Sequence, residues 1–403
     1  MNPAAAQTSP RKRTPWWGRV LLVVLSLAAA LGVAEYWVRN HWPAAGQVLV
    51  LDDEFLFVPK PYAGHVQYMQ EHVGGGKIVV QLHADGMRSP DPDPAHPRPR
   101  WIVFGDSFVM ADNEPYERTF PARLQALTDD RVEVLSAGVT GYGPDQTWMR
   151  MQQLLPKWKP EAAILVICAV NDFGDPVRNN LMRLDADGVL HRQKATPGPQ
   201  DREWFLQRQE ESRRSGLARL WLAWHQWRAL EVPKSPDQTL LADYMRAERE
   251  DYEAHISGST VANALLRDIY DADVAIHPEW PSSQYKLRLA EAILAGIRDL
   301  CAEQGVPLAV VVVPGAPDAD PDYWLRPDPG RYPGWQPERL TSEWQGICER
   351  VGVPVLNLYG TLKDAGHRVF VGALDPHWNG AGMDLGARTA LPFLESQGWS
   401  LGR

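Results

Sequence analysis

The feature that most constrains the fold is a regular alternation of short apolar runs with helical stretches, which begins at Arg100. Each run is brief, rich in β-branched residues and bounded by turn residues, as expected of strands buried on both faces of a parallel sheet. Strands that alternate with helices in this way are typical of an α/β fold. The five predicted strands cover residues 101–104, 132–135, 162–167, 308–313 and 353–358.

Helices fill most of the intervals between these strands, and the pattern predicts them over residues 121–127, 145–155 and 287–303. The interval between the third and fourth strands, about residues 175–285, is too long for a simple crossover. Within it, one predicted helix carries a tryptophan-bearing face, made by Leu217, Leu220, Trp221, Trp224 and Arg228. We therefore expect an inserted helical subdomain beside or over the carboxyl edge of the sheet, where ligands bind in open α/β folds.

The N-terminal region contains an apolar segment that is long enough to cross a membrane. Residues 20–38 contain only Ser26 and Glu35 as polar interruptions, and they span about 28 Å as a helix. Aromatic residues stand at both ends, where amphipathic rings prefer the membrane interface; they are Trp16, Trp17, Tyr36, Trp37 and Trp42. The preceding residues include Arg11, Lys12, Arg13 and Arg19 and no acid, so we expect a cytoplasmic N-terminus and a translocated remainder.

The same segment also fits a cleaved signal peptide, because residues 32–34 offer a small-x-small cleavage site before Glu35. Its length and aromatic ends favour an uncleaved single-pass anchor, whereas a buried core helix would show a polar outward face. We therefore expect a basic cytoplasmic tail over residues 1–18 and an anchor over 19–38. We expect residues 39–99 to form an extracytoplasmic lead-in. Residues 100–400 should form the catalytic domain, which would be periplasmic or otherwise extracytoplasmic.

Composition excludes some functions. The formal net charge of the 403 residues is −9, which argues against a nucleic-acid partner because phosphate binding needs a concentrated basic surface. The three cysteines, Cys168, Cys301 and Cys348, show no metal-ligand spacing, so neither a metal nor another cofactor is indicated. Cys301 and Cys348 fall late in two successive predicted helices, so a disulfide between them competes with the favoured interpretation of two buried thiols.

Two short segments could supply a nucleophile and its base. Ser107 lies in Gly-Asp-Ser-Phe directly after the first predicted strand, where a tight glycine turn projects a hydroxyl over the edge of the sheet. A serine hydroxyl is a poor nucleophile until an imidazole takes its proton and a carboxylate orients that imidazole. Asp375 and His377, in Asp-Pro-His-Trp-Asn near the C-terminus, are close enough in sequence to form such a pair. Each segment alone is also compatible with an ordinary turn.

Two further segments could stabilise a negative oxygen. Gly138 ends the second predicted strand, and a glycine there lets a backbone N–H approach a substrate. Asn171 follows the third strand, where its amide could donate to the same oxygen or merely cap the loop.

Together the four segments resemble the blocks of the SGNH hydrolases, also called GDSL esterases, in the order of that family. The resemblance extends over about residues 82–395 and includes Asp85-Gly86-Met87-Arg88, which is similar to a segment that precedes the serine block in bacterial members. It implies a three-layer α/β/α, flavodoxin-like fold with a five-stranded parallel sheet. It also implies Ser107 as nucleophile, His377 as base and Asp375 as its orienting partner. The backbone N–H groups of Ser107 and Gly138 and the side chain of Asn171 would form the oxyanion hole.

Two positions depart from the family pattern. Phe108 replaces the leucine of the name motif, and Ser136 replaces the asparagine two residues before the glycine of the second block, which puts hydrogen bonding at that turn in doubt.

The resemblance implies a serine-dependent esterase acting on an acyl ester, with acylated polysaccharide as one candidate substrate. An O-acyltransferase that moves acetyl groups onto or between extracytoplasmic glycans is the alternative. The Asp-Pro-His-Trp-Asn block is similar to that of periplasmic alginate acetyltransferases, and a membrane anchor suits a polymer substrate. A non-catalytic binding module is the second alternative, which the complete set of residues disfavours. In a transferase, the helix around Trp221 and Trp224 would be a candidate lid that keeps water scarce, although packing against the sheet is the favoured role of this helix.

Overall fold

The computed structural model describes residues 15–41, 48–69, 76–194, 197–218, 220–221, 238–259, 270–372 and 375–399. The chain forms two compact units, one made of residues 1–44 and 213–230 and the other of residues 45–212 and 231–403. The larger unit contains the sheet and every candidate site residue.

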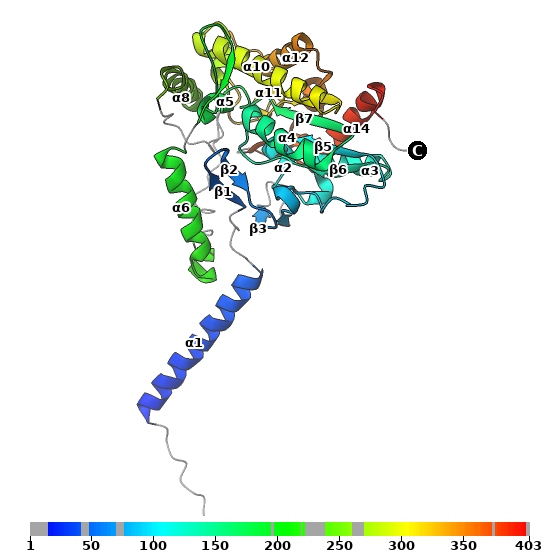
Figure 1. The fold of residues 1–403 in the computed structure, drawn as a ribbon. Coiled ribbons are helices and arrows are strands. Elements are labelled where there is room, and N and C mark those ends of the chain that lie inside the picture. The colour runs from blue at the N-terminus through cyan, green and yellow to red at the C-terminus, as the bar shows by residue number, and fades with distance from the viewer. Residues whose placement is uncertain are drawn as a thin grey trace, which may run out of the picture. The chain divides into compact units, whose positions relative to one another are not determined.

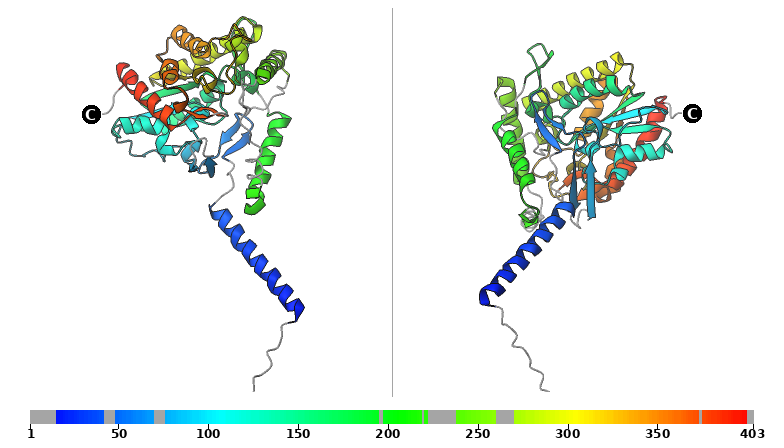
Figure 2. Two further views of the ribbon diagram at one scale, coloured as in Figure 1. Left: turned by 180° about the vertical axis from the view of Figure 1, so that it is seen from behind. Right: turned by 60° about the horizontal axis from the view of Figure 1, so that its bottom comes forward.

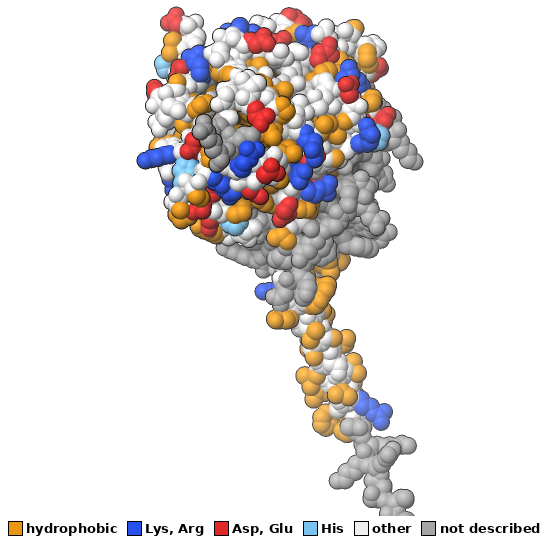
Figure 3. All heavy atoms as spheres, turned by 90° about the vertical axis from the view of Figure 1, so that its right-hand side faces the viewer, with side chains coloured by type: hydrophobic (Ala, Val, Ile, Leu, Met, Phe, Trp, Pro, Cys, Tyr) orange, Lys and Arg blue, Asp and Glu red, His pale blue; other side chains and the backbone are white. Residues whose placement is uncertain are grey.

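The smaller unit is built on one long helix, α1 (Trp16–His41). Residues Trp16–Arg39 have a mean hydropathy of 2.0, and nearly all of them are exposed, so this helix has the length and composition to cross a membrane. Figure 3 shows apolar side chains along the length of α1, whereas the face of the larger unit in that view mixes charges of both signs with apolar groups. The predicted apolar helix is therefore present.

The tryptophan-bearing segment is described only in part. Within the smaller unit, the carboxylate of Glu35 accepts hydrogen bonds from the backbone N–H groups of Gly216 (2.7 Å) and Leu217 (3.0 Å). Trp221 is exposed, and Trp224 and Arg228 lie outside the described residues. Both roles predicted for this segment, packing against the sheet and a lid, stay predictions.

The larger unit is organised around a five-stranded parallel sheet, as predicted (Figure 1). Its strands are β5 (Arg100–Phe104), β6 (Glu133–Ser136), β7 (Ala162–Cys168), β10 (Leu308–Val313) and β11 (Val355–Asn357). They lie side by side in the order β6-β5-β7-β10-β11, and each neighbouring pair is parallel. Every residue of β5, β6 and β7 is buried, which explains why these strands appear in the sequence as continuous apolar runs.

Helices form a layer on each side of the sheet (Figure 2). On one side, α10 (Pro281–Glu303) packs against α4 (Pro144–Trp158) and α12 (Arg339–Val351). On the other side, α14 (Gly380–Ser396) packs against α3 (Phe120–Leu127). The buried residues Leu289, Ile293, Ile297 and Cys301 of α10 recur every four positions, so they form one apolar stripe. The strand order and the two helical layers confirm the predicted flavodoxin-like, three-layer α/β/α fold.

The lead-in before the sheet contains strands that the sequence pattern did not reveal. β1 (Leu49–Asp52) pairs with β2 (Leu56–Pro59), and β3 (Gly64–Met69) pairs with β4 (Gly76–Gln81), both antiparallel. Phe57 of β2 is fully buried and meets the ring of Tyr142 edge-on at 5.4 Å. The residues before Arg100 therefore contribute to the core of the larger unit.

The insertion between β7 and β10 is mainly helical, as predicted. It contains α5 (Asp175–Asn179), α6 (Pro199–Arg213), α8 (Gln238–Ser257) and α9 (Ala272–Ile276). It also contains one short antiparallel pair that was not predicted, β8 (Met182–Leu184) with β9 (Leu190–Arg192).

The cysteines confirm the interpretation as buried thiols. Cys168, Cys301 and Cys348 are all free and buried, so the competing disulfide between Cys301 and Cys348 is not formed. Burial raises the pKa of both Cys301 and Cys348 to about 12, which keeps these thiols protonated and unreactive near neutral pH.

Candidate active site

Ser107 lies at the carboxyl end of β5, at the start of the one-turn helix α2 (Ser107–Met110). The preceding residue, Asp106, caps this turn, because its side chain accepts a hydrogen bond from the N–H of Phe108 at 2.9 Å. Gly105 makes the turn tight, since a Cβ at this position would lie 2.8 Å from the backbone oxygen of Val166 on β7. Ser107 itself is only 9% exposed. The local sequence thus places the hydroxyl at the edge of the sheet, as predicted.

His377 and Asp375 complete a hydrogen-bonded chain with Ser107. The Nε2 atom of His377 lies 2.7 Å from Oγ of Ser107, a residue 270 positions away. On the other side of the ring, Nδ1 lies 2.6 Å from Oδ1 of Asp375. The same carboxylate oxygen also accepts the backbone N–H of His377 at 2.9 Å. These distances allow a proton to pass from the hydroxyl to the imidazole while the carboxylate fixes the ring.

The electrostatics of Asp375 suit an orienting role. Burial by itself would raise the pKa of this carboxyl, but the charge and hydrogen bonds of His377 outweigh burial and lower the pKa below its ordinary value. Asp375 therefore stays ionised at neutral pH, and its negative charge can stabilise an imidazolium as it forms.

The rest of the Asp-Pro-His-Trp-Asn block holds the pair in place. Residues Asp375–Trp378 form β13, which pairs with β12 (Phe370–Gly372). Trp378 is fully buried, donates from Nε1 to the backbone oxygen of Phe108 at 2.9 Å, and stacks on Phe120. Asn379 caps α14 through hydrogen bonds from the N–H groups of Ala381 and Gly382. The block therefore joins the histidine directly to the turn that carries the serine.

Gly138 approaches the same turn from β6. A Cβ at this position would lie 2.5 Å from Cβ of Val109, so only glycine fits against α2. Within the described residues, the N–H groups of Ser107 and Gly138 have no hydrogen-bond acceptor, as donors kept for a substrate oxygen would require. Ser136 fills the place of the asparagine in the family pattern, and its hydroxyl donates to the backbone oxygen of Val109 at 3.5 Å. The turn thus keeps a side-chain hydrogen bond, although a long one.

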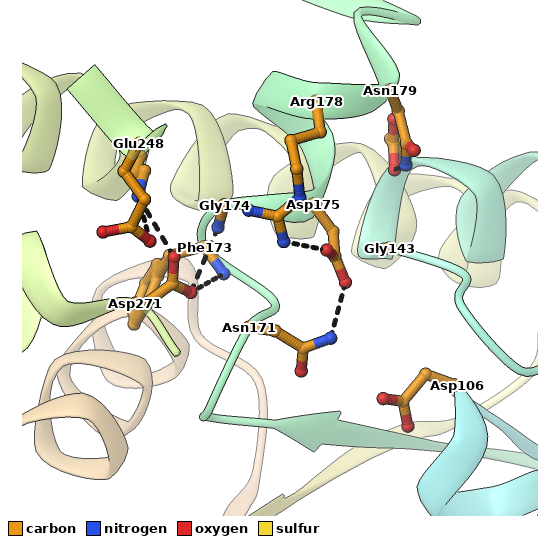
Figure 4. A network of polar contacts seen from close by, with 12 residues as sticks. Asp106, Gly143, Asn171, Phe173, Gly174, Asp175, Arg178, Asn179, Glu248 and Asp271 are labelled. Carbon is orange, nitrogen blue, oxygen red and sulfur yellow. Dashed lines mark hydrogen bonds and ion pairs between the residues drawn. The ribbon is translucent and has the colours of Figure 1, made fainter. Parts of the chain in front are cut away.

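Asn171 follows β7, the neighbour of β5 on the other side. Because β6, β5 and β7 are adjacent and parallel, their carboxyl ends meet at one edge of the sheet, and Gly138, Ser107 and Asn171 come from these three ends. The side-chain nitrogen of Asn171 donates to Oδ2 of Asp175 at 2.8 Å (Figure 4). An amide nitrogen carries two hydrogens, so one N–H is still available to a ligand.

Several supporting residues were not identified from the sequence. Arg88, in the segment similar to the family lead-in, is buried and donates to the backbone oxygens of Met110, Ala111 and Glu114, just after the serine turn. Asp175 and Asp271 contact the loop that carries Asn171. Lys286 supports this loop by pairing with Asp271. The sequence could have revealed it, because Lys286 falls on the apolar stripe of α10, three residues before Leu289. A lysine on such a stripe indicates a buried ion pair.

Comparisons with known proteins give distant likenesses only. No protein-family model matches the chain, and no curated protein matches it. Among solved structures, it is similar to a lipase/acylhydrolase from Enterococcus faecalis, at 13% identity and a TM-score of 0.34, covering 74% of this chain and 96% of that one. A GDSL-like lipase from Bacteroides thetaiotaomicron shows 11% identity and a TM-score of 0.34, covering 77% and 93%. An acetyl xylan esterase shows 12% and 0.35, covering 73% and 98%. Likenesses this distant assign no activity, so the function is argued from the site.

Proposed function

We propose that this chain is an SGNH/GDSL-type serine hydrolase that cleaves carboxylic ester bonds. The observation that carries the proposal is the continuous chain of short hydrogen bonds from Asp375 through His377 to Ser107. The two unpaired backbone N–H groups beside it and the amide of Asn171 supply donors for a developing oxyanion. We propose acyl esters as its substrates, with acylated polysaccharides among the candidates.

In the first half of the reaction, Oγ of Ser107 attacks the ester carbonyl carbon while Nε2 of His377 takes the hydroxyl proton. The carbonyl oxygen becomes negative and receives hydrogen bonds from the N–H groups of Ser107 and Gly138 and from the side chain of Asn171. As the tetrahedral intermediate collapses, the bond to the alcohol oxygen breaks and His377 returns its proton to that oxygen. The products are a free alcohol and an ester between the acyl group and Ser107.

In the second half, water takes the place of the alcohol. His377 removes a proton from the water as its oxygen attacks the acyl carbon, and the same donors stabilise the second oxyanion. Collapse breaks the bond to Oγ, and the proton passes from His377 back to Ser107. The carboxylic acid leaves and the enzyme is regenerated without any cofactor.

The proposal is tested with full-length protein in detergent and nitrophenyl acetate as the substrate. Wild-type protein should release nitrophenol catalytically, and Ser107→Ala should reduce the rate to that of buffer without lowering the melting temperature. Ser342→Ala, on the distant helix α12, is the matched control and should behave as wild type. Equal turnover by the wild type and Ser107→Ala would remove the basis of the proposal.

The acyltransferase alternative differs only in the second half, so the acceptor distinguishes the two. A hydrolase releases acetate rapidly without an added acceptor, and oligosaccharides do not change the rate. A transferase releases acetate slowly, and an oligosaccharide accelerates turnover and becomes acetylated, which mass spectrometry detects. We expect the first result.

We further infer that α1 anchors the catalytic unit to a membrane with the N-terminus in the cytoplasm. The apolar helix and the four basic residues at its start support this topology. A reporter enzyme that is active only outside the cytoplasm, fused after residue 403, should be active, and the chain should stay with membranes after a salt wash. Soluble chains that begin at Glu35 would show a cleaved signal peptide instead.

A further inference from the structure

The loop that carries Asn171 is fixed by a residue from the far end of the insertion. Oδ2 of Asp271 accepts the backbone N–H groups of Phe173 (3.0 Å) and Gly174 (3.1 Å), as Figure 4 shows. The backbone N–H of Asp271 in turn donates to the oxygen of Val170 at 2.7 Å. The backbone of Gly174 packs tightly against Asp271, because a Cβ at this position would lie 2.5 Å from Oδ1 of Asp271. Asp271 thus holds the loop on both sides of Asn171.

Asp271 is itself held by a buried lysine. Nζ of Lys286 lies 3.1 Å from Asp271, 2.8 Å from Asp273 and 3.0 Å from Glu248, and all four side chains are buried. The three carboxylates approach one another as metal ligands do, but the ammonium group of Lys286 already lies among them. Burial alone would lower the pKa of Lys286, but the three acids outweigh burial and raise it above its ordinary value. Lys286 therefore stays charged, and its ion pair with Asp271 supports the loop.

The side chain of Asn171 is oriented by a second buried acid. Asp175 accepts the amide nitrogen of Asn171 at 2.8 Å through Oδ2, and its other oxygen pairs with the guanidinium of Arg178. A carboxylate accepts hydrogen bonds but does not donate them. An amide turned by 180° would bring the oxygen of Asn171 against this carboxylate, and the two would repel. Asp175 therefore determines which end of the amide is available to a ligand.

We propose that Asp175 is a positioning residue for the oxyanion hole: it holds the amide of Asn171 so that the second N–H faces the substrate oxygen. This inference rests on the proposed esterase function. Donors stabilise an oxyanion only when they lie about 2.7–3.1 Å from it, so an amide that samples both orientations loses much of its effect. Burial raises the pKa of Asp175 to about 7 against the opposing charge of Arg178, so the ionised carboxylate that excludes the turned amide is the dominant form above that pH, where activity is measured.

The test is a double-mutant cycle on Ser107-dependent hydrolysis of nitrophenyl acetate by the full-length protein. Asp175→Asn keeps the shape of the side chain but no longer excludes the turned amide. It should lower kcat roughly tenfold to a hundredfold with little change in KM, as expected when a catalytic group loses its alignment. In an Asn171→Ala background, where there is no amide left to orient, Asp175→Asn should cause no further loss.

Asp145→Asn is the matched control. Asp145 is equally buried and accepts the amide nitrogen of a different asparagine, Asn179, at 2.9 Å. Its replacement should leave kcat within about twofold of the wild type, since Asp145 does not contact Asn171. A similar loss of kcat in this variant would show that any buried charge near the loop matters, and it would overturn the specific role of Asp175.

The remaining outcomes separate the inference from the function on which it rests. If the wild type shows Ser107-dependent turnover but Asp175→Asn leaves kcat unchanged, the inference alone is overturned. The same holds if Asp175→Asn lowers kcat equally in the presence and in the absence of Asn171. A wild type without Ser107-dependent turnover overturns the proposed function and the inference with it.

If Asp175→Asn fails to fold, as judged by its melting curve, the wild type labelled with ¹⁵N-asparagine replaces it. The side-chain signals of Asn171, identified by their loss in Asn171→Ala, should show one slowly and one rapidly exchanging proton. Two rapidly exchanging protons would overturn the inference.

Discussion

The two sides of Ser107 are held in different ways. On the base side, Asp375 orients His377 from two residues away, and its side chain is 34% exposed. On the oxyanion side, the side chain of Asp175 accepts a hydrogen bond from Asn171 and is only 5% exposed. The loop that carries Asn171 is also held by Asp271, almost a hundred residues later in the chain. The base side is thus a local arrangement, whereas the oxyanion side is fixed by tertiary packing.

The two orienting acids also differ in their electrostatics. Burial opposes ionisation of both, but His377 lowers the pKa of Asp375, whereas the pKa of Asp175 rises to about 7 despite Arg178. The difference matches their tasks. In the proposed mechanism, Asp375 carries a charge that stabilises the imidazolium during each turnover, whereas Asp175 accepts a hydrogen bond from an amide that stays neutral. We therefore expect mutations on the base side to reduce catalysis more than mutations on the oxyanion side.

The largest predicted effect is that of Asp375→Asn. An amide in this position favours the wrong tautomer of His377, so kcat for nitrophenyl acetate should fall about 10⁴-fold. Asp364→Asn, an exposed acid on α13 (Tyr359–Ala365), is the control and should keep full activity. The melting temperature should change little, because the pair is local and half-exposed. A loss below tenfold would show that the base side does not depend on this carboxylate.

Asn171→Ala should have the next largest effect, lowering kcat roughly 10²–10³-fold, the usual loss for one oxyanion donor. KM should stay close to its wild-type value, since the hydrogen bond strengthens only as the oxyanion forms. The matched control is Asn357→Ala, which removes an asparagine from the end of another strand of the same sheet, β11. A larger loss in Asn171→Ala than in Asp375→Asn would reverse the comparison between the two sides.

Lys286→Met tests whether tertiary packing supports the oxyanion side. It leaves Asp271, Asp273 and Glu248 buried without their cation, so the free energy of unfolding should fall by about 3–5 kcal/mol near neutral pH. The neighbouring acids raise the pKa of Lys286 above its ordinary 10.5, so the wild type keeps this stabilisation at any pH below that value. Arg298→Met, on the exposed side of the same helix, is the control.

The same variant should show a stronger pH dependence than the wild type. Burial and the charge of Asp273 already raise the pKa of Glu248, and without the ammonium group that pKa rises further, while Asp273 loses the cation that lowers its own pKa. The folded state then binds more protons, so its stability decreases as pH rises through that range. Melting curves of Lys286→Met should therefore move toward those of the wild type at pH 5 and away from them at pH 8. A difference that does not depend on pH would contradict the assignment of charge in this cluster.

Ser136→Ala should have the smallest effect. The hydrogen bond from Ser136 to the oxygen of Val109 is 3.5 Å long, and a bond of this kind contributes at most about 1 kcal/mol. We expect kcat to change less than fivefold. A loss as large as that of Asn171→Ala would show that this turn contributes to the oxyanion side more than its geometry indicates.

The contrast between the two sides explains what the sequence could predict. Ser107, Asp375 and His377 lie in short blocks whose spacing reflects local geometry, and the structure brings them together as expected. The five strands were also predicted, because each contains an apolar run, and complete burial makes the runs of β5 and β7 the clearest. Asp175 and Asp271 could not be predicted, since a polar residue beside a loop usually lies in solvent. Only the packing of the insertion buries these two and directs them at the loop.

The first two strands of the lead-in, β1 and β2, were missed for a related reason. β1 and β2 are four residues each, and Phe57 is buried because Tyr142 and Phe205, both far along the chain, pack against it. Runs this short carry too little periodicity to separate a strand from an extended linker.

The most direct test of the central claim is the detection of an acyl group on Ser107. Full-length protein is mixed with nitrophenyl acetate, quenched in acid after increasing times and analysed by peptide mass mapping. We predict one acetyl group on the peptide that contains Ser107, absent in Ser107→Ala and formed far more slowly in His377→Ala. His367→Ala, which removes an exposed histidine, should acylate at the wild-type rate. Acetylation elsewhere on the chain, or equal labelling of Ser107 without His377, would contradict the account.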